Sequence, residues 1–373
     1  MQEERRRILR LVEEGKLTVE EALALIEKLD HEKESHEKKW ASFSPSILLK
    51  KDEKEGQTSG SAENQEGFGS GSKTASKLMG WVDFAVKKVK ELDLDLAIGP
   101  AFDVSHIFQY SGKGLMEWDV QIVNGNVTFK PWHEDEVRIE CEAKVYQIED
   151  ADQAKEAFLK NFYCDLEGSK LRVQCDKKAM KANVVIFLPA KVYESAKVKL
   201  FNGPIRGEQL TVKDFKAKTA NGVISLTSLT GEKAELETAN GQIKLAQHEF
   251  QTVEAETIHG MIDVSGAGRK LDLQSFNGRI QLQVSDPECK TIHCSAATGS
   301  VEISIPQAIK SAGQLKTNLG SLHCYLDSLE ITGEKHETIA KELKFRSNEH
   351  AAGDLSVFAD SKTGSVVLKH IER

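Results

Sequence analysis

A short phrase built around one glycine recurs along the second half of the chain, and this recurrence limits the possible folds more than any other feature. The phrase is Asn-Gly-Val-Ile-Ser-Leu at residues 221–226, and it returns as Asn-Gly-Gln-Ile-Lys-Leu at residues 240–245. Its glycines follow one another at nearly equal intervals, except for a longer last interval that contains a weaker copy at Gly353. The eight glycines are Gly203, Gly222, Gly241, Gly260, Gly278, Gly299, Gly320 and Gly364.

A regular period of about 20 residues with one glycine per unit is typical of a solenoid. Each unit is too short to bury its own apolar side chains, so stacked neighbours must supply the core. Apolar residues alternate after each glycine, which indicates strands rather than helices. We therefore predict a mainly β fold, a single-chain parallel β-helix (β-solenoid), with the eight glycines as structural corners. The residues expected to point inward are Ile224, Leu226, Ile243, Leu245, Ile262, Val264, Ile280 and Leu282, with a second apolar track at Leu236, Val253, Leu271, Leu273 and Ile292.

An asparagine precedes many of these glycines. Asparagine suits a corner, because it tolerates left-handed backbone and can hydrogen-bond its own backbone. Stacked Asn202, Asn221, Asn240 and Asn277 are expected to form a ladder. We favour a corner-stabilising role for this ladder over ligand or metal binding.

Residues 1–30 are predicted to form an α-helical hairpin that serves as an interaction or oligomerisation module. Gly15 offers a helix stop, and Thr18 followed by Glu21 forms a capping box for a second helix. Helices this short are marginal alone, so the hairpin is expected to pack on itself, on a second copy or on a protein partner. Its expected partner-binding residues are Ile8, Leu11, Val12, Leu25, Ile26 and Leu29.

Two further segments precede the β region. Residues 31–72 are predicted to be a linker, which is charged at first and rich in glycine and serine from Gly56 onward. Residues 73–99 contain an amphipathic helix with lysines opposite an apolar face. We favour a role for this helix as a cap over the open end of the solenoid. The alternative is contact with an anionic membrane surface through Trp81, Lys87, Lys88 and Lys90.

Residues 100–373 are predicted to form the β-helix domain, and its first part mixes strands with one helix. Residues 137–145 alternate between apolar and polar as a half-buried strand does, and residues 150–162 fit a helix. Asn124-Gly125 is predicted to be a hairpin turn between two short strands. Further strands are expected at 171–174 and 183–188.

Charge and targeting signals narrow the class of protein. The chain has 50 Lys and Arg against 58 Asp and Glu, a net charge of -8, which argues against a nucleic-acid partner. It shows no signal peptide and no apolar stretch long enough for a transmembrane helix, so we expect a cytoplasmic protein that is at most peripheral at the membrane. The six cysteines, none in a CxxC pair, are expected to be reduced and mostly buried.

No motif for catalysis or for a cofactor stands out, so we predict a non-enzymatic protein with no cofactor or metal. P-loop, GxGxxG, GxSxG and HExxH patterns are absent. His293-Cys294 and His323-Cys324 lie at different offsets from their nearest repeat glycines, which favours buried thiols and surface histidines over a metal site. The alternative is a β-helical enzyme or lectin acting on envelope polysaccharide, with paired carboxylates or aromatic platforms on the solenoid.

The order of these parts resembles the LiaX/YvlB-like cell-envelope stress proteins of Gram-positive bacteria. The likeness rests on four parts of the chain, in this order. They are the opening segment Ile8-Leu-Arg-Leu-Val-Glu-Glu-Gly-Lys-Leu-Thr-Val-Glu-Glu-Ala, the linker at 31–72, the segment Lys90-Glu-Leu-Asp-Leu-Asp and the C-terminal β-helix. The resemblance implies an adhesin-like β-helix domain of uncharacterised function. It also implies a regulatory or scaffold role in the response to membrane-active antimicrobial peptides, and it carries over no catalytic residues.

Overall fold

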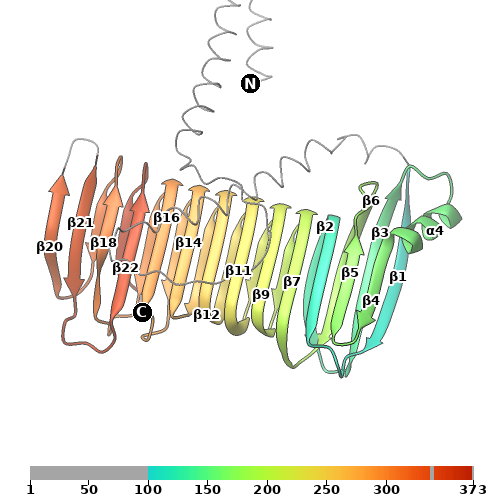
Figure 1. The fold of residues 1–373 in the computed structure, drawn as a ribbon. Helices are drawn as coiled ribbons and strands as arrows, with labels where there is room; N and C mark the ends of the chain where they lie inside the picture. Colours follow the sequence, from blue (N-terminus) through green and yellow to red (C-terminus); the bar gives the residue numbers. More distant parts are fainter. Residues whose placement is uncertain (1–99, 337–339, 372–373) are drawn as a thin grey trace, which may run out of the picture. The chain divides into compact units, whose positions relative to one another are not determined.

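The computed structural model describes residues 100–336 and 340–371. Within these residues the chain forms a β-solenoid of 23 strands with one helix at its N-terminal end (Figure 1). The predicted hairpin at 1–30, linker at 31–72 and amphipathic helix at 73–99 lie outside the described residues. Those three segments remain predictions.

The strands fall into two tracks that enclose the core, and each strand pairs with strands of its own track in neighbouring coils. Track A contains β4 (Phe162–Glu167), β5 (Lys170–Cys175), β7 (Val192–Asn202), β9 (Thr211–Asn221), β11 (Thr230–Asn240), β14 (Lys270–Asn277), β16 (Thr291–Thr298), β18 (Ser311–Thr317), β20 (Leu329–His336), β21 (Lys341–Ser347) and β22 (Leu355–Ser361). Track B contains β1 (Ala101–Ser111), β3 (Glu136–Tyr146), β6 (Met180–Pro189), β8 (Ile205–Glu208), β10 (Ile224–Thr227), β13 (Ile262–Ala267), β15 (Ile280–Val284), β17 (Val301–Ile305), β19 (Leu322–Tyr325) and β23 (Val366–His370). Two long strands, β2 (Glu117–Trp132) and β12 (Ile243–His259), run through both tracks.

The repeat period sets the register between strands of neighbouring coils. Ile224 pairs with Ile243, and Thr230 pairs with Glu249, so the same interval separates equivalent residues in both tracks of these coils. Every residue predicted to point inward is at most 1% exposed, which confirms both apolar tracks. Burying each such aliphatic side chain contributes about 1.5–3 kcal/mol relative to leaving it exposed, so stacking is driven by the shared core.

Each middle coil has a second corner opposite the glycine corner. It is formed by residues with positive φ that are not glycine, namely Gln209, Ser228 and Gln247, at 52°, 56° and 54°. The residue that follows each of them is buried, as Leu210 and Leu229 illustrate. This corner was not predicted, because no glycine marks it.

The N-terminal end is closed by antiparallel strands and the helix. β1 pairs with β3, and β3 pairs with β6, all antiparallel. Helix α4 (Ala151–Asn161) starts after its N-cap Asp150, packs on β1, β3 and β4, and buries Ala154 and Phe158. The helix predicted at 150–162 and the strands predicted at 137–145, 171–174 and 183–188 are confirmed.

The hairpin turn predicted at Asn124-Gly125 is wrong. Both residues lie inside the long strand β2, whose two halves pair in parallel with β7 and β8. Gly125 has φ 144° and forms the corner of the first coil. An Asn-Gly pair suits a tight turn and a solenoid corner equally well, and the neighbouring coil decides between them.

At the C-terminal end the order of the coils departs from the order of the sequence (Figure 1). β22 lies between β16 and β18, and β23 lies between β17 and β19. The antiparallel pair of β20 and β21 then closes track A. The weaker copy of the phrase predicted at Gly353 is also wrong, because this glycine precedes the track A strand β22 rather than a track B strand.

Candidate binding surfaces

One edge of the solenoid is a stack of corner glycines. It contains all eight predicted glycines and Gly125. A Cβ built on any of the eight would lie 1.6–2.2 Å from the carbonyl oxygen of the glycine in the adjacent coil. Only Gly125, Gly203, Gly260 and Gly299 of this stack have positive φ. Close approach of neighbouring backbones, rather than an unusual conformation, is therefore what all these positions share.

An asparagine ladder runs beside the glycines, as predicted for Asn202, Asn221 and Asn240. Each Nδ2 donates to the Oδ1 of the asparagine in the preceding coil, over 2.8–2.9 Å, and the series continues to Asn124. The prediction that Asn277 belongs to the ladder is wrong, because His259 occupies the register position between Asn240 and Asn277. The amides all point in one direction, and such chains of hydrogen bonds polarise one another.

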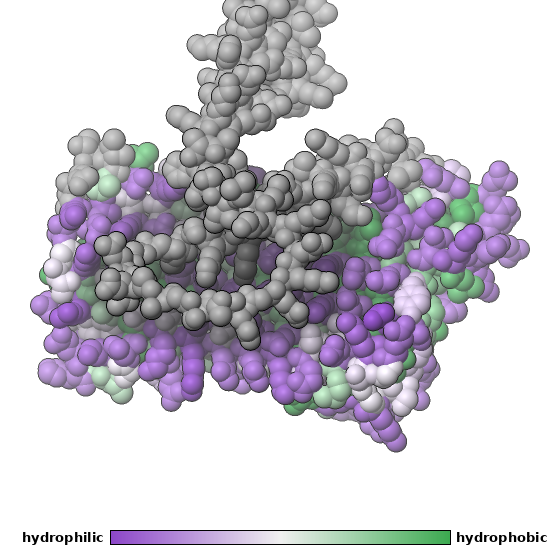
Figure 2. Space-filling model, viewed as in Figure 1, coloured by the Kyte–Doolittle hydropathy of each residue, from purple (hydrophilic) through white to green (hydrophobic). Residues whose placement is uncertain are grey.

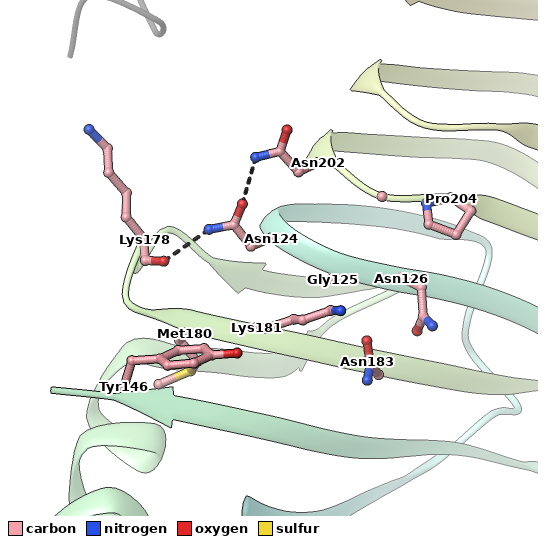
Figure 3. Close-up of a pocket in the computed structure, with 11 residues that line it drawn as sticks. Asn124, Gly125, Asn126, Tyr146, Lys178, Met180, Lys181, Asn183, Asn202 and Pro204 are labelled. Atoms are coloured by element: carbon pink, nitrogen blue, oxygen red, sulfur yellow. Dashed lines mark hydrogen bonds between the residues drawn. The ribbon is translucent and has the colours of Figure 1, made fainter. Parts of the chain in front are cut away.

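The ladder ends at a pocket of about 440 Å³ beside the first coil (Figure 3). Residues from β2, β3, β6 and β7 and from adjoining turns form its walls. The lining residues are Asn124, Gly125, Asn126, Tyr146, Lys178, Met180, Lys181, Asn183, Asn202, Gly203 and Pro204.

Asparagine is the commonest polar residue among those that line this pocket. Asn124 Nδ2 donates to the carbonyl oxygen of Lys178 at 2.9 Å, which ends the ladder. Asn126 of β2 and Asn183 of β6 are register partners, and their side chains lie close together in Figure 3. Asn183 Oδ1 is buried and accepts no hydrogen bond within the described part of the chain.

This chemistry suits binding of a polar group. The lining holds four asparagines, two lysines and one tyrosine, and it contains no Asp, Glu, His or Cys. Amides donate and accept hydrogen bonds, so they match hydroxyl or acetamido groups. The paired carboxylates that glycoside hydrolysis needs are not among these lining residues.

Titratable groups gather at a second place, on the outer face of track A. His293 Nδ1 lies 2.9 Å from Asp272 Oδ1, and this hydrogen bond raises the pKa of His293. Burial raises the pKa of the neighbouring Asp360, which accepts a hydrogen bond from Ser295 Oγ at 3.0 Å. Since Ser295 donates to a carboxylate rather than to His293, the cluster lacks the serine–histidine contact of an activated nucleophile. No group of His, Cys, Asp and Glu in the described residues is arranged to hold a metal ion.

Ion pairs cross between coils on the same face. Glu235 of β11 accepts from Lys216 of β9, and Glu237 accepts from Lys218 of β9. Glu235 also accepts from Lys233 of its own strand. Burial opposes ionisation of Glu235, but its two lysine partners lower the pKa to about 2. Exposed pairs of this kind contribute less than about 1 kcal/mol each. Hydrophilic residues predominate on the visible solenoid surface in Figure 2.

The cysteines behave as predicted. Cys141, Cys175, Cys289 and Cys294 are buried, the other two are half-buried, and all six are free thiols. Burial raises the pKa of the Cys175 thiol to about 11, so the thiolate is disfavoured at neutral pH. His293 and His323 are half-buried.

The predicted partner-binding and membrane-surface residues lie outside the described residues, so the structure brings none of them to a site. The predicted corners do come together, and they lead to a pocket that was not predicted. A signal for that pocket exists in the sequence. Asn124-Gly-Asn-Val-Thr-Phe129 follows the same pattern as the repeat phrase, and this pattern is equally compatible with one more coil and with the hairpin turn that was predicted.

The solenoid with its glycine corners and asparagine ladder defines the class of protein. The family described as Toastrack DUF4097 matches residues 133–361, and a SHOCT-like domain matches residues 3–34. The chain belongs to the Toastrack DUF4097 family. It is 50% identical to protein YvlB of Bacillus subtilis (strain 168), described there as uncharacterised, over the full length of both chains. The resemblance inferred from the sequence is thereby confirmed.

Several solved structures resemble this chain, and candidate adhesins are among them. One from Bacteroides fragilis is 11% identical, covers 72% of this chain and 97% of its own, and has a TM-score of 0.33. Another from Parabacteroides distasonis is 9% identical, covers 73% and 98%, and has a TM-score of 0.34. No helix among residues 100–336 and 340–371 is long and apolar enough to span a bilayer.

Proposed function

We propose that this protein is a non-enzymatic scaffold of the bacterial cell-envelope stress response. The solenoid presents rigid binding surfaces, and residues 1–30 recruit a protein partner or self-associate. The protein acts in the cytoplasm, peripherally at the membrane, and responds to membrane-active peptides. This role rests on the membership of the family, the order of the sequence segments and the surfaces described above.

The observation that carries the proposal is the regular build of the solenoid. Its interior is filled by apolar side chains from both tracks, and the asparagine ladder joins the glycine corners of four successive coils. A core packed in this way holds the outer faces in a fixed arrangement, as a binding platform requires. The platform therefore offers a surface for a partner, and the linker lets residues 1–30 bind at a distance from it.

Crosslinking mass spectrometry on the full chain, in native host cells with and without envelope stress, tests the partner claim. We expect Leu11→Asp combined with Leu25→Asp to remove the crosslinked partner or the self-association, because both substitutions charge the apolar face. Glu14→Gln on the polar side is the matched control and should change nothing. Identical crosslinks from all three proteins would contradict the recruiting role of residues 1–30.

Flotation with vesicles that contain anionic lipid tests the membrane claim. We expect binding that falls as salt rises and that is lost in a Lys87→Glu, Lys88→Glu, Lys90→Glu variant. The matched control reverses three exposed solenoid lysines, at Lys130, Lys244 and Lys362, so that net charge changes equally. Equal loss in both variants would show a general charge effect and would count against a membrane-binding segment.

A second candidate function, saccharide binding, is favoured by the pocket of Figure 3. Its amides and Tyr146 offer donors and acceptors, and Asn183 Oδ1 lacks a donor within the described part of the chain. A hydroxyl or acetamido N–H of an envelope saccharide would satisfy that oxygen. This candidate is a lectin, since the pocket lining holds no acid for hydrolysis.

Asn183→Ala separates binding from folding in this pocket. The substitution removes a buried acceptor without a partner, so stability should hold or rise by up to about 1 kcal/mol. Titration calorimetry with N-acetylglucosamine oligomers should show binding to the wild-type chain and at least tenfold weaker binding to the variant. Absence of binding by the wild type would remove this second candidate.

A further inference from the structure

The outer face of track A sorts its charges into blocks instead of alternating them. Two adjacent strands, β7 and β9, carry only lysine at two neighbouring outward positions, and the next two strands, β11 and β12, carry only glutamate there. The lysine block is Lys197, Lys199, Lys216 and Lys218, and the glutamate block is Glu235, Glu237, Glu254 and Glu256. Strand register places each block in two rows across the coils.

This block arrangement destabilises the single chain. Lys197 is the register neighbour of Lys216, and Glu235 is the register neighbour of Glu254. Neighbouring strands lie about 4.8 Å apart, and like charges directly side by side are destabilising. Alternating lysine and glutamate from coil to coil would give each charge two opposite neighbours.

Contacts within the chain relieve part of this cost. Ion pairs join Lys216 to Glu235 and Lys218 to Glu237 at the boundary between the blocks, and Lys233 reaches both Glu235 and Glu254. The outer lysines Lys197 and Lys199 are exposed, and of their register partners on β2 one is acidic and one is Gln121. An opposite charge from outside the chain would therefore stabilise these two outer lysines.

A second copy of the face supplies that charge in one geometry. A twofold axis parallel to the strands, midway between β9 and β11, stacks two faces with their coil order reversed. β7 then lies opposite β12 of the second copy, and β9 lies opposite β11. Lys197 meets Glu254, Lys199 meets Glu256, Lys216 meets Glu235 and Lys218 meets Glu237, each twice.

The same arrangement also brings opposite charges together at neighbouring positions. Asp214 comes opposite Lys233, and Glu117 comes opposite Lys270, again with opposite charges. Asp119 and Asp272 are the like-charged pair in this overlap of β2 to β14. Moving the axis by half a coil onto β9 would place Lys216 opposite itself, and an axis along the solenoid would place each block opposite itself. The charge pattern thus selects one arrangement.

We infer that the outer face of track A is a self-complementary docking surface that pairs two copies of this chain face to face in antiparallel order. An isologous contact of this kind needs a surface whose charge inverts across the axis, and this face has it. Six strands and about seven residues of each give roughly 600 Å² per copy, at the low end for specific interfaces. The pair is accordingly weak and sensitive to salt. It does not use residues 1–30, so it stands apart from the recruiting role proposed for them.

Sedimentation of the full chain in 50 mM and 500 mM salt, with charge-swapped variants, tests the inference. The wild type should associate in low salt and dissociate in high salt. Lys197→Glu with Lys199→Glu, and separately Glu254→Lys with Glu256→Lys, should each weaken association at least tenfold. An equimolar mixture of the two variants should restore it, because every facing pair from the two blocks is again opposite in charge.

We expect both charge-swapped variants to keep the fold. The first places carboxylates beside Lys216 and Lys218, with one of them also beside Asp119. The second places ammonium groups beside Glu235 and Glu237 and breaks the ion pair of Lys233 with Glu254. Gains and losses offset in each variant, so the thermal unfolding temperature should stay close to that of the wild type. Lys130→Glu with Lys244→Glu, on track B, is the matched control and should associate as the wild type does.

Zero-length carboxyl–amine crosslinking of mixed ¹⁴N and ¹⁵N chains adds a readout specific to this face. Hybrid crosslinks between Lys197 and Glu254 are expected. A wild type that is monomeric in low salt, association that both charge-swapped variants retain, or Lys197–Glu254 crosslinks confined to single chains would each overturn the inference. The same sedimentation series on the Leu11→Asp, Leu25→Asp chain separates this association from any self-association through residues 1–30.

Discussion

A histidine stands where the repeat calls for leucine. His248 follows the second corner of its coil as Leu210 and Leu229 follow theirs, and all three are at most 3% exposed. Nδ1 accepts from the Phe250 N–H at 3.3 Å, while the buried Nε2 has no partner among the described residues. Burial lowers the pKa of His248 to about 4.

We expect His248 to make the solenoid sensitive to acid. The unfolded chain binds a proton near pH 6.5, but the folded chain does so only near 4, so stability is complete above 6.5 and falls as pH drops through this window. The loss is on the order of 3 kcal/mol. Denaturant unfolding should show His248→Leu more stable than the wild type, by a margin that widens between pH 7.5 and 4.5. A constant margin would mean that His248 does not titrate in this way.

Gly241 tests the crowding of the corner. A Cβ at this position would lie 1.9 Å from the carbonyl oxygen of Gly222, and its φ is not in the left-handed region. Gly241→Ala must therefore push two coils apart, and we expect it to cost about 4 kcal/mol or more of unfolding free energy. Gly114→Ala is the control, since its nearest atom lies 3.9 Å away, and it should change stability by under about 1 kcal/mol. Equal effects would show that crowding is not the reason for glycine.

Among the elements, helix α4 has the most distinct task, because it covers the apolar end that the first coils leave open. Phe158 is fully buried and stacks on Phe162 with ring centroids 5.0 Å apart. Leu159, the next residue, is 49% exposed. The two side chains therefore differ in burial while sharing one helix.

Phe158→Ala should open this end of the solenoid. We expect it to lower unfolding free energy by about 3–5 kcal/mol, because it leaves a cavity against the core. Leu159→Ala should cost under about 0.5 kcal/mol. Urea unfolding of both variants measures the difference. If the two variants lose the same stability, α4 does not cap the core through Phe158.

At the scale of the whole molecule, the final strands of the sequence are internal to the stack. Ending the chain at Asn348 removes β22 and β23, which separate β16 and β17 from β18 and β19. We expect residues 311–325 to lose protection from amide hydrogen exchange, while residues 291–305 keep most of theirs. In a solenoid stacked in sequence order, such a truncation would leave 311–325 protected, and that result would contradict the inserted order.

Much of the middle of the molecule was predictable from the sequence. Ile224, Ile243 and Ile262 recur at one constant interval, and each must be covered by its equivalent in the next coil. The pocket was harder to predict from the sequence, since Asn183 lines it from a strand that the repeat does not include. The second corner at Ser228 was missed because its positive φ carries no glycine.

The sequence by itself determined the coil, its two apolar tracks and its glycine corners, because these depend on spacings within one repeat and its neighbour. Only the tertiary structure decided that Asn124-Gly125 is a corner and that Gly364 stacks between Gly299 and Gly320. Coil edges expose the same backbone donors and acceptors, so local sequence does not dictate which coil lies next to which. The order follows from closing the ends, where α4 covers one and the pair of β20 and β21 covers track A at the other.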